Sequence, residues 1–395
     1  MTLKKTVDPC VETEPFSEYG EWNLLRFGDA SVFSDSSKFY PLDFSLFCNK
    51  NLEILEDKIE SINLVSHIYP SNVCNQNCYY CFTRNDRILY PKRMLSEKAI
   101  DNIANSVERC GLKLARIVGT GEPLTNPLTP TLIKKLNQKG VYITLITNGE
   151  LLDEDHYFGL NLIDLIQENV KFLRISIDAS DSNTYQLLHN PSRNDAFKKI
   201  LKSIENISKK KENNDIVIGA TFIITTENMD QMVKFAKLCA NIGVDVIWYR
   251  VVNGKNLSQY EIEIINKQIK DLKKVDIKIN FEKLNKRIAN LTYNMGQTCY
   301  ATKFKSVVTS DGKVYPCITY QFNKKYELGN LNTNSLYEIL SSDIYKNFLK
   351  ARRSGLLKCC EKGCHEKVFN NSMILHKQNI SSNIFYKEYK SYELK

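Results

Sequence analysis

The sequence predicts an α/β protein built around a partial (β/α)6 barrel, with a small cysteine-rich domain towards its C-terminal end. Two observations support this fold class. Short β-branched runs alternate with amphipathic helical patterns from about residue 62 to 275, and the cysteines gather mainly in two groups. The apolar runs are almost continuous, which indicates parallel strands covered on both faces. A chain of 395 residues suffices for one large domain with an attachment, or for two to three domains.

Strand patterns recur roughly every 30 residues, as expected for strand–helix units. Strands are expected at 62–69, 114–118, 141–147, 172–177, 216–223 and 244–250. Helices are expected over about 96–110, 130–139, 155–168, 195–210, 227–242 and 258–274. Such units imply right-handed parallel crossovers, in an open doubly wound sheet or in a barrel short of eight strands. Both arrangements gather ligands at the carboxyl ends of the strands.

The composition is that of a globular protein, with 43% hydrophobic and 25% charged residues. No run approaches the roughly 18 apolar residues of a membrane span, and the N-terminus lacks the apolar stretch of a signal peptide. The net charge of +9 comes from basic residues spread among acidic ones, and the dense run at 209–211 resembles a solvated loop. We therefore expect a cytoplasmic protein that binds neither nucleic acid nor membranes.

Twelve cysteines in a chain without a secretion signal favour metal ligands or buried thiols over disulfides. Three lie within 74–81 and five within 299–364, which indicates two metal sites. The four isolated ones are interpreted as buried small residues: Cys10, Cys48, Cys110 and Cys239.

The patterns divide the chain into four parts. We expect an N-terminal extension at 1–60, a barrel at 61–285, a cysteine-rich domain at 290–370 and a polar tail at 371–395. The extension mixes aromatic and polar residues, with one short helical run at 52–59. It is interpreted as a packing extension or as part of a substrate lid.

The first cysteine group reads Cys74-Asn-Gln-Asn-Cys78-Tyr-Tyr-Cys81 and follows the first expected strand. Three thiolates in one loop can bind three irons of a cubane cluster, which normally takes four cysteines. The fourth iron is then open to a cofactor or substrate, as an open zinc position is in catalysis. Zinc is the alternative, but no further Cys or His lies between residues 68 and 109 to complete its ligands.

The Cys-x3-Cys-x2-Cys spacing, with Tyr80 before the third cysteine, resembles the signature of the radical S-adenosylmethionine (SAM) superfamily. The resemblance implies a [4Fe–4S] cluster on Cys74, Cys78 and Cys81 whose open iron chelates the amino and carboxylate groups of SAM. A reducing partner such as flavodoxin or ferredoxin is implied as the electron source. Cleavage of SAM then gives methionine and a 5′-deoxyadenosyl radical, which abstracts hydrogen from the substrate. The protein mainly positions and shields this chemistry.

Three further segments are similar to the SAM-binding positions of the family, and the resemblance covers about 62–275. Thr120-Gly121-Glu122-Pro123 resembles its Gly-Gly-Glu-Pro motif, which holds the SAM amino group, although a threonine replaces the first glycine. Ser176 and Asp178 fall where fourth-strand residues contact the ribose and carboxylate of SAM, unless they only make strand-end hydrogen bonds. Asn148 ends the third strand, where a turn role is equally open. The expected cofactor contacts are Tyr80, Gly121, Glu122, Asn148, Ser176 and Asp178.

The second cysteine group begins at a predicted hairpin. Asp311-Gly312 forms the turn, and Cys299 and Cys317 flank the two strands, so they could approach one another. Cys360 and Cys364 can supply two more metal ligands. Cys359 is the alternative to Cys360, and the spacing does not decide between them.

The spacing Cys299, twelve residues, Gly312, four residues, Cys317 resembles the auxiliary-cluster extension of radical SAM enzymes. Its long form is called SPASM and its short form twitch. Five candidate cysteines, rather than the seven of the long form, favour one auxiliary [4Fe–4S] cluster. A structural zinc site is the alternative, because four cysteines suit zinc equally well.

The resemblance implies a radical SAM oxidoreductase with two functional alternatives. One oxidises a small biosynthetic metabolite, with the auxiliary cluster taking an electron. The other is a maturase that installs a thioether, crosslink or epimerisation in a peptide. Peptide maturases often carry an N-terminal peptide-binding module of strands and helices, and the short segment before residue 61 favours the small metabolite. Tyr249 and Arg250, at the end of the sixth strand, are the expected substrate contacts.

Overall fold

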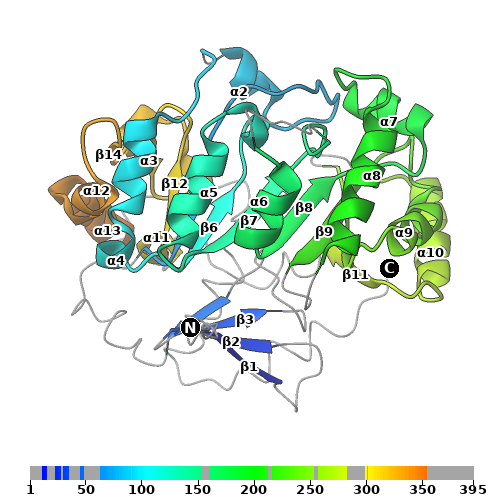
Figure 1. Cartoon of the computed structure of the whole chain (residues 1–395), viewed down its shortest axis with the longest axis horizontal. Helices are drawn as coiled ribbons and strands as arrows, with labels where there is room; N and C mark the ends of the chain where they lie inside the picture. The colour runs from blue at the N-terminus through cyan, green and yellow to red at the C-terminus, as the bar shows by residue number, and fades with distance from the viewer. Residues whose placement is uncertain are drawn as a thin grey trace, which may run out of the picture.

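The computed structural model describes residues 63–89, 91–153, 160–211, 216–252, 257–282, 299 and 301–353. It also describes the backbone of four N-terminal strands: β1 (Val11–Pro15), β2 (Asn23–Phe27), β3 (Ala30–Ser34) and β4 (Ser45–Cys48). These four form an antiparallel sheet in sequence order. The rest of the described chain is built around a second, larger sheet (Figure 1).

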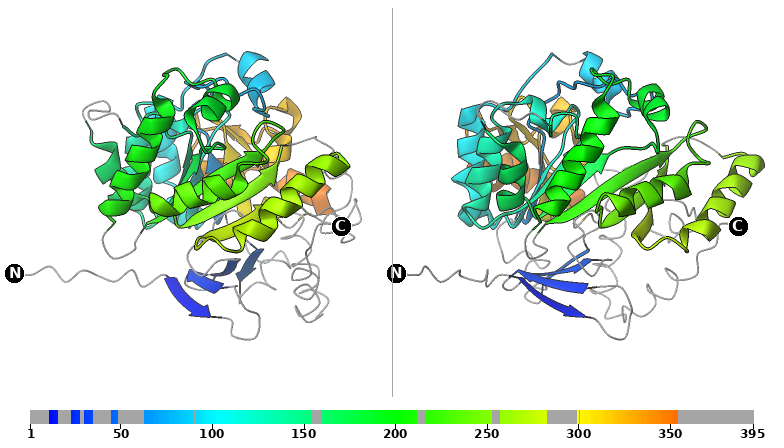
Figure 2. Two further views of the ribbon diagram at one scale, coloured as in Figure 1. Left: turned by 90° about the vertical axis from the view of Figure 1, so that its right-hand side faces the viewer. Right: turned by 45° about the vertical axis from the view of Figure 1, so that its right-hand side comes forward.

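The larger sheet has ten strands in the order β11-β10-β9-β8-β7-β6-β5-β12-β13-β14. From β5 to β11 every neighbouring pair is parallel, and neighbours in space are neighbours in sequence. These strands are β5 (Val65–Ile68), β6 (Leu114–Ile117), β7 (Tyr142–Thr147), β8 (Phe172–Ser176), β9 (Val217–Ile224), β10 (Val246–Val251) and β11 (Lys278–Glu282). With helices on its outer face, the sheet is a partial barrel (Figure 2).

Helices connect the parallel strands, as right-handed crossovers require. They are α3 (Glu97–Ala104), α4 (Val107–Cys110), α5 (Thr129–Asn137), α6 (Leu162–Asn169), α7 (Ser182–His189), α8 (Ala196–Lys209), α9 (Met232–Asn241) and α10 (Gln259–Leu272). A short helix, α2 (Arg84–Leu89), follows the cysteine loop. Ser96 caps α3 by accepting a hydrogen bond from Ala99 N, as its sequence position predicts.

Side chains alternate between the two faces of the parallel strands. The outward ones, such as Ile117, Leu145 and Ile175, form the main apolar core with the covering helices. The inward ones include Phe172 and Trp248, whose rings pack edge to face with centroids 5.5 Å apart. Both faces of the strands are therefore buried, which explains why the strand segments are apolar nearly throughout.

The six expected parallel strands are confirmed, and so is the α/β barrel class. The structure adds β11, a seventh parallel strand that the sequence reading missed because Lys278 to Glu282 alternates charged and apolar residues. It also adds α7, and it divides the helix expected at 96–110 into α3 and α4. The break falls at Asn105 and Ser106, both weak helix formers.

The predicted hairpin is confirmed and joins the open side of the barrel. β12 (Lys305–Val308) pairs in parallel with β5 and antiparallel with β13 (Lys313–Tyr315). β14 (Gly329–Asn330) extends the sheet, and α11 (Ala301–Phe304), α12 (Leu336–Ser341) and α13 (Asp343–Arg353) pack around it. Gly312 takes the left-handed conformation that the turn requires, with φ of 81°.

The N-terminal sheet lies at the end of the barrel opposite to α2, which follows the cysteine loop (Figures 1 and 2). The sequence analysis did not anticipate the four strands of the N-terminal segment. The helix expected at 52–59 lies outside the described residues. Among the described residues, no helix has the length and apolar character needed to cross a membrane.

Candidate active site

The loop that carries Cys74, Cys78 and Cys81 leaves the carboxyl end of β5 and is tied to the end of α7. Asn77 N donates to His189 O at 3.1 Å, and Tyr79 N donates to Leu188 O at 3.3 Å. The loop is therefore fixed by a helix more than a hundred residues away in the sequence.

Gly121 fixes the start of the same loop. Its N–H donates to Ser71 O at 3.2 Å, and Glu122 N donates to Val73 O at 2.8 Å. A Cβ atom at Gly121 would lie only 2.1 Å from Val73 O, so any other residue here would push the loop away. The close approach of two backbone segments explains the glycine of this motif without any ligand.

All three thiols of the loop are partly exposed. Arg87 Nη2 lies 3.7 Å from Cys81 Sγ, and Asn148 Nδ2 lies 3.9 Å from Cys74 Sγ. In the described part of the chain, no three Cys, His, Asp or Glu side chains are grouped closely enough for a single metal ion. A cubane is larger than one ion and its ligand sulfurs sit on separate irons, so three spread thiolates near N–H donors fit such a cluster.

Burial and the nearby Glu122 carboxylate raise the pKa of the Cys74 thiol to about 12. A thiol must lose its proton to bind iron, and a bound cation lowers its pKa strongly. Cluster binding at this loop would therefore require Cys74 to release a proton.

Glu122 is buried and braces two strand ends. Its carboxylate accepts hydrogen bonds from Thr147 Oγ1 at 2.6 Å, Asn148 N at 2.7 Å and Leu124 N at 3.0 Å. Burial is the largest influence on this group and raises its pKa to about 7. Glu122 thus joins the end of β6 to the end of β7, and three of its acceptor positions are already used inside the protein.

Asp178 is also buried and turned into the protein. Its Oδ2 accepts a hydrogen bond from Tyr80 Oη at 2.6 Å and lies 3.3 Å from His189 Nε2, while its Oδ1 accepts from Ile223 N at 2.7 Å. Its φ of 55° is a left-handed conformation that non-glycine residues rarely adopt. Asp178 and Tyr80 contact each other, and both polar groups are directed at the loop and its support; their expected contacts with SAM stay predictions.

His189 is a component of the site that the sequence reading missed. Its Nδ1 lies 3.0 Å from Gln76 Oε1 and 3.5 Å from Cys78 Sγ. Gln76 Nε2 donates to Glu150 and to Tyr185 Oη, which leaves its carbonyl oxygen facing His189. With Asp178 at Nε2, both imidazole nitrogens face acceptors, and this arrangement suits the imidazolium form.

Burial alone would lower the pKa of His189, but the neighbouring Cys78 and the hydrogen bond to Asp178 outweigh it and raise the pKa to about 10. A buried imidazole that favours its protonated form therefore lies against the loop. The signal in the sequence was a single His at the end of an unpredicted helix, which no local pattern connects with cysteines a hundred residues earlier.

Ser176 and Asn148 remain near the mouth of the barrel. Ser176 ends β8 half-buried, and its hydroxyl has no hydrogen-bond partner among the described residues. Asn148 donates to Asn75 Oδ1 at 2.7 Å and accepts from Glu150 N at 3.0 Å, so it both shapes the turn and contacts the loop.

The expectation that Tyr249 contacts the substrate is wrong. The side chain is fully buried among Phe222 and Phe235 on the outer face of β10, and its hydroxyl donates to Met232 O at 2.6 Å. Arg250, the next residue, lies on the opposite, inner face because side chains alternate along a strand. It stays a predicted contact.

The second cysteine group is described only in part. Cys299 is buried before α11 and Cys317 is half-buried after β13. Cys299 precedes β12, which is parallel to β5, and Cys317 follows β13, which is antiparallel to β12. Both cysteines therefore lie towards the amino-terminal end of β5, whereas the first loop follows its carboxyl end. Cys359, Cys360 and Cys364 lie outside the described residues, so the four-cysteine ligand set stays a prediction.

Comparison with known families identifies the class of protein. Residues 68–239 match the radical SAM superfamily, and residues 299–365 match the SPASM iron–sulfur cluster-binding domain. The chain therefore belongs to the radical SAM superfamily and is an enzyme whose cofactors are SAM and [4Fe–4S] clusters. The two matched regions coincide with the barrel up to α9 and with the segment that begins at the hairpin.

Several characterised proteins share most of the chain. A tungsten-containing aldehyde ferredoxin oxidoreductase cofactor-modifying protein of Pyrococcus furiosus is 25% identical over 73% of this chain and 83% of its own. A GTP 3′,8-cyclase of Staphylococcus saprophyticus is 29% identical over 67% and 82%. A cysteine-type anaerobic sulfatase-maturating enzyme of Clostridium novyi is 22% identical over 85% and 95%.

Among solved structures, SuiB of Streptococcus suis bound to S-adenosylmethionine shares the fold. The TM-score is 0.59 at 19% identity, over 79% of this chain and 75% of SuiB. SuiB has also been solved with its precursor peptide SuiA, at a TM-score of 0.58. At this identity the similarity supports the fold alone.

Proposed function

We propose that Cys74, Cys78 and Cys81 hold the [4Fe–4S] cluster that reductively cleaves SAM. The observation that carries this proposal is the position of the three partly exposed thiols, on one loop at the carboxyl end of β5. The bound cluster and SAM supply the radical chemistry. The residues of this chain orient the loop through Gly121, shield it with α2, and hold it against His189.

For SAM itself, we propose contacts with the Ser176 hydroxyl and the Asn148 side chain. They lie at the carboxyl ends of β7 and β8, two and three strands from β5 in the sheet, where ligands of parallel sheets bind. Glu122 and Asp178 are assigned to positioning, because their carboxylates already accept hydrogen bonds from the protein. Tyr80 acts with Asp178.

We propose that the C-terminal segment binds one auxiliary [4Fe–4S] cluster through Cys299, Cys317, Cys360 and Cys364. Hydrogen abstraction leaves a radical on the substrate. Loss of one electron to the auxiliary cluster and of one proton to a base completes a two-electron oxidation. This balance makes the enzyme an oxidoreductase rather than an isomerase.

We propose a peptide as the substrate. The short segment before residue 61 had favoured a small metabolite, but four strands occupy it, so one reason against a peptide-binding module is removed. One similar protein is named for maturing a sulfatase, and SuiB has been solved bound to a precursor peptide. Edge strands of such a sheet can pair with an extended peptide.

Oxidation of a small metabolite is the second candidate. Arg116 and Arg174 lie on the inner face of the barrel and are largely buried, and the Arg174 guanidinium is 5.3 Å from the Trp248 ring. Buried cations in the lumen suit an anionic substrate. The similar GTP 3′,8-cyclase also acts on a small anionic molecule, by its name.

Anaerobic reconstitution tests these proposals in order. With dithionite and SAM, the wild-type protein should form 5′-deoxyadenosine, and Cys78→Ala should form none. Cys239→Ala, which removes an isolated buried thiol, is the control and should keep the activity. About eight irons per chain are expected with two clusters, and about four would contradict the auxiliary cluster.

The substrate class is tested with short peptides encoded beside this gene. The peptides are labelled with deuterium at Cα or Cβ and then incubated with the active enzyme. Transfer of deuterium into 5′-deoxyadenosine with a mass loss of two hydrogens in the peptide supports the maturase. Transfer from a phosphorylated metabolite instead supports the second candidate.

A further inference from the structure

The surface around the cysteine loop exposes large apolar side chains. Six large hydrophobic residues are exposed in the described parts of the chain, and four of them lie on or beside this loop. They are Phe82 (67% exposed), Leu187 (62%), Tyr79 (47%) and Met94 (42%). Leu187 adjoins Leu188, whose carbonyl accepts from Tyr79 N, and Met94 bridges to Ser71 before the loop. Clusters of exposed apolar residues on this scale mark interaction sites.

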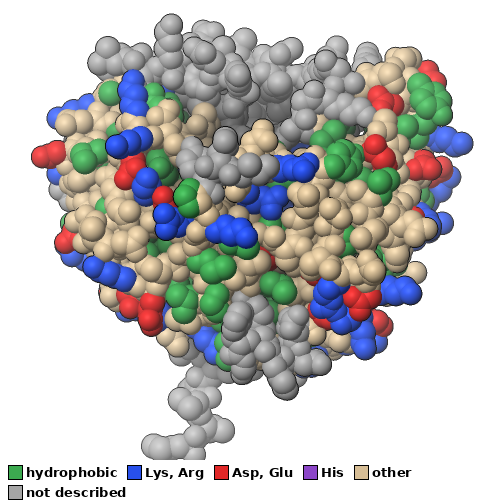
Figure 3. Space-filling model, turned by 90° about the horizontal axis from the view of Figure 1, so that it is seen from above, with side chains coloured by type: hydrophobic (Ala, Val, Ile, Leu, Met, Phe, Trp, Pro, Cys, Tyr) green, Lys and Arg blue, Asp and Glu red, His purple; other side chains and the backbone are tan. Residues whose placement is uncertain are grey.

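Exposed cations flank these apolar residues. Arg84, Lys92 and Arg93 are exposed, and none of them forms an ion pair with a described residue. We call the four apolar and three basic residues together the loop face. Seen from above, Lys and Arg side chains gather beside hydrophobic ones near the middle of this side of the molecule (Figure 3). One carboxylate nearby, Glu227, is engaged by Tyr79 Oη at 2.6 Å.

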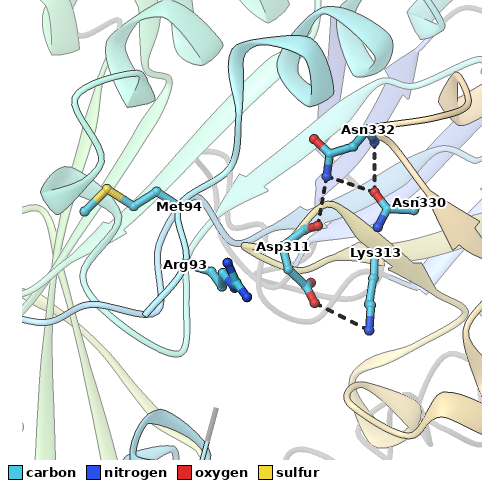
Figure 4. Close-up of a pocket in the computed structure, with 6 residues that line it drawn as sticks. All are labelled: Arg93, Met94, Asp311, Lys313, Asn330 and Asn332. Atoms are coloured by element: carbon cyan, nitrogen blue, oxygen red, sulfur yellow. Dashed lines mark hydrogen bonds and ion pairs between the residues drawn. The ribbon is translucent and has the colours of Figure 1, made fainter. Parts of the chain in front are cut away.

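The loop face continues into a hollow next to the hairpin. A cavity of about 420 Å³ is lined by Arg93, Met94, Asp311, Lys313, Asn330 and Asn332. Arg93 and Met94 stand on one wall and the hairpin residues on the other (Figure 4). Lys313 Nζ lies 3.6 Å from Asp311 Oδ2, and Arg93 is exposed on the opposite wall. The cavity can receive a side chain of a docked protein.

The loop face lies directly over the cysteines. Arg87 of α2 is half-buried, with Nη2 3.7 Å from Cys81 Sγ and Nη1 3.4 Å from Gln76 O. A protein seated on α2 and Phe82 would be separated from the thiolates by a single layer of side chains. Electron transfer between proteins weakens steeply with distance, so this is the favourable side from which to reduce a cluster on the loop.

We propose that the loop face is the docking surface for a small acidic one-electron carrier protein. The apolar residues supply contact area, and the exposed cations attract the carrier and orient it. In each encounter the carrier loses one electron and the cluster gains it, which supplies the electron for cleaving one C–S bond of SAM. The inference rests on the proposed assignment of Cys74, Cys78 and Cys81 as cluster ligands.

The test compares two reductants on the same holoenzyme. In the variant Arg84→Glu/Lys92→Glu/Arg93→Glu, we expect the binding of flavodoxin, measured by isothermal titration calorimetry, to weaken at least about tenfold. The formation of 5′-deoxyadenosine driven by reduced flavodoxin should fall by a similar factor. With dithionite, which needs no docking surface, the rate should stay within about twofold of wild type. The matched control Lys198→Glu/Lys202→Glu/Lys237→Glu, on the outer helices α8 and α9, should behave as wild type with both reductants.

The possible outcomes distinguish a failure of the docking surface from a failure of the proposed function. An equal loss with both reductants, or an unchanged rate with flavodoxin, would overturn the docking surface. A wild-type enzyme that forms no 5′-deoxyadenosine even with dithionite would contradict the proposed function instead. Raising the salt concentration should slow the flavodoxin-driven rate of wild type but not of the charge-reversed variant, because screening removes the attraction.

Discussion

The cysteine loop and the hairpin that follows Cys299 carry the two groups of cysteines, and they are held in different ways. The loop is fixed by buried polar groups from distant strands, above all Glu122, Asp178 and His189. The hairpin is fixed by a tight turn and by apolar packing, with Val308 and Val314 in the main core. Polar networks are costly when one member is removed, whereas apolar packing and turns tolerate change better. The first site is therefore expected to be the more fragile.

The largest difference is expected for alanine at the two close-approach glycines. Gly121→Ala should lower the free energy of unfolding by about 4 kcal/mol and displace the loop, because the new Cβ meets the Val73 carbonyl at 2.1 Å. Gly329→Ala in the hairpin region should cost about 1 kcal/mol, since its Cβ meets only the movable Ile339 side chain at 2.8 Å. Urea unfolding of both variants measures this. Equal costs would remove the contrast between the regions.

Glu122 should make the loop region sensitive to pH. Burial raises its pKa from 4.5 in the unfolded chain to about 7, so the folded state favours the protonated form. The stability it contributes is complete below pH 4.5 and is lost as pH rises through about 7, a fall of about 3 kcal/mol. Glu122→Gln should abolish this component. Unfolding free energies of variant and wild type between pH 4.5 and 8 check it, and parallel curves would contradict it.

Removing the imidazole should be more harmful than removing a hydroxyl from the second region. His189→Phe should cost about 2 kcal/mol, because the carboxylate of Asp178 and the amide of Gln76 lose a buried partner. The comparison variant is Tyr345→Phe, which removes a hydrogen bond of 2.9 Å to Thr302 O and should cost about 1 kcal/mol. Thermal unfolding of the two variants measures both costs. A larger cost for Tyr345→Phe would contradict the greater fragility of the cysteine loop.

The smallest effect is expected at the polar contact between the hairpin region and the start of α3. Asn332 Nδ2 donates to Asp311 O at 3.0 Å, and its Oδ1 accepts from Ser96, the cap of α3. Asn332→Ala should therefore cost about 1 kcal/mol without changing SAM cleavage. A loss of activity comparable with that of His189→Phe would mean that the regions are coupled through the hairpin.

The alternation of apolar strands and amphipathic helices was sufficient to predict the parallel strand–helix units, because parallel strands buried on both faces leave a continuous apolar pattern. The choice of a barrel over an open sheet came from the family resemblance. The same pattern failed for β11, an edge strand with charged residues, and for the four N-terminal strands, where polar and aromatic residues mix. Edge and antiparallel strands need cover on one side only, so their sequences are less distinctive.

The sequence by itself determined the class of enzyme, since the three cysteines, their spacing and the motif at Gly121 are local features of the chain. The turn at Gly312 was likewise readable, because a two-residue hairpin constrains its own backbone. Tertiary structure alone decided the protein contacts of Glu122 and Asp178, whose carboxylates accept hydrogen bonds from neighbouring strands. It alone brought His189 to Cys78 and gathered the loop face, because contacts between distant segments depend on how the strands and helices pack.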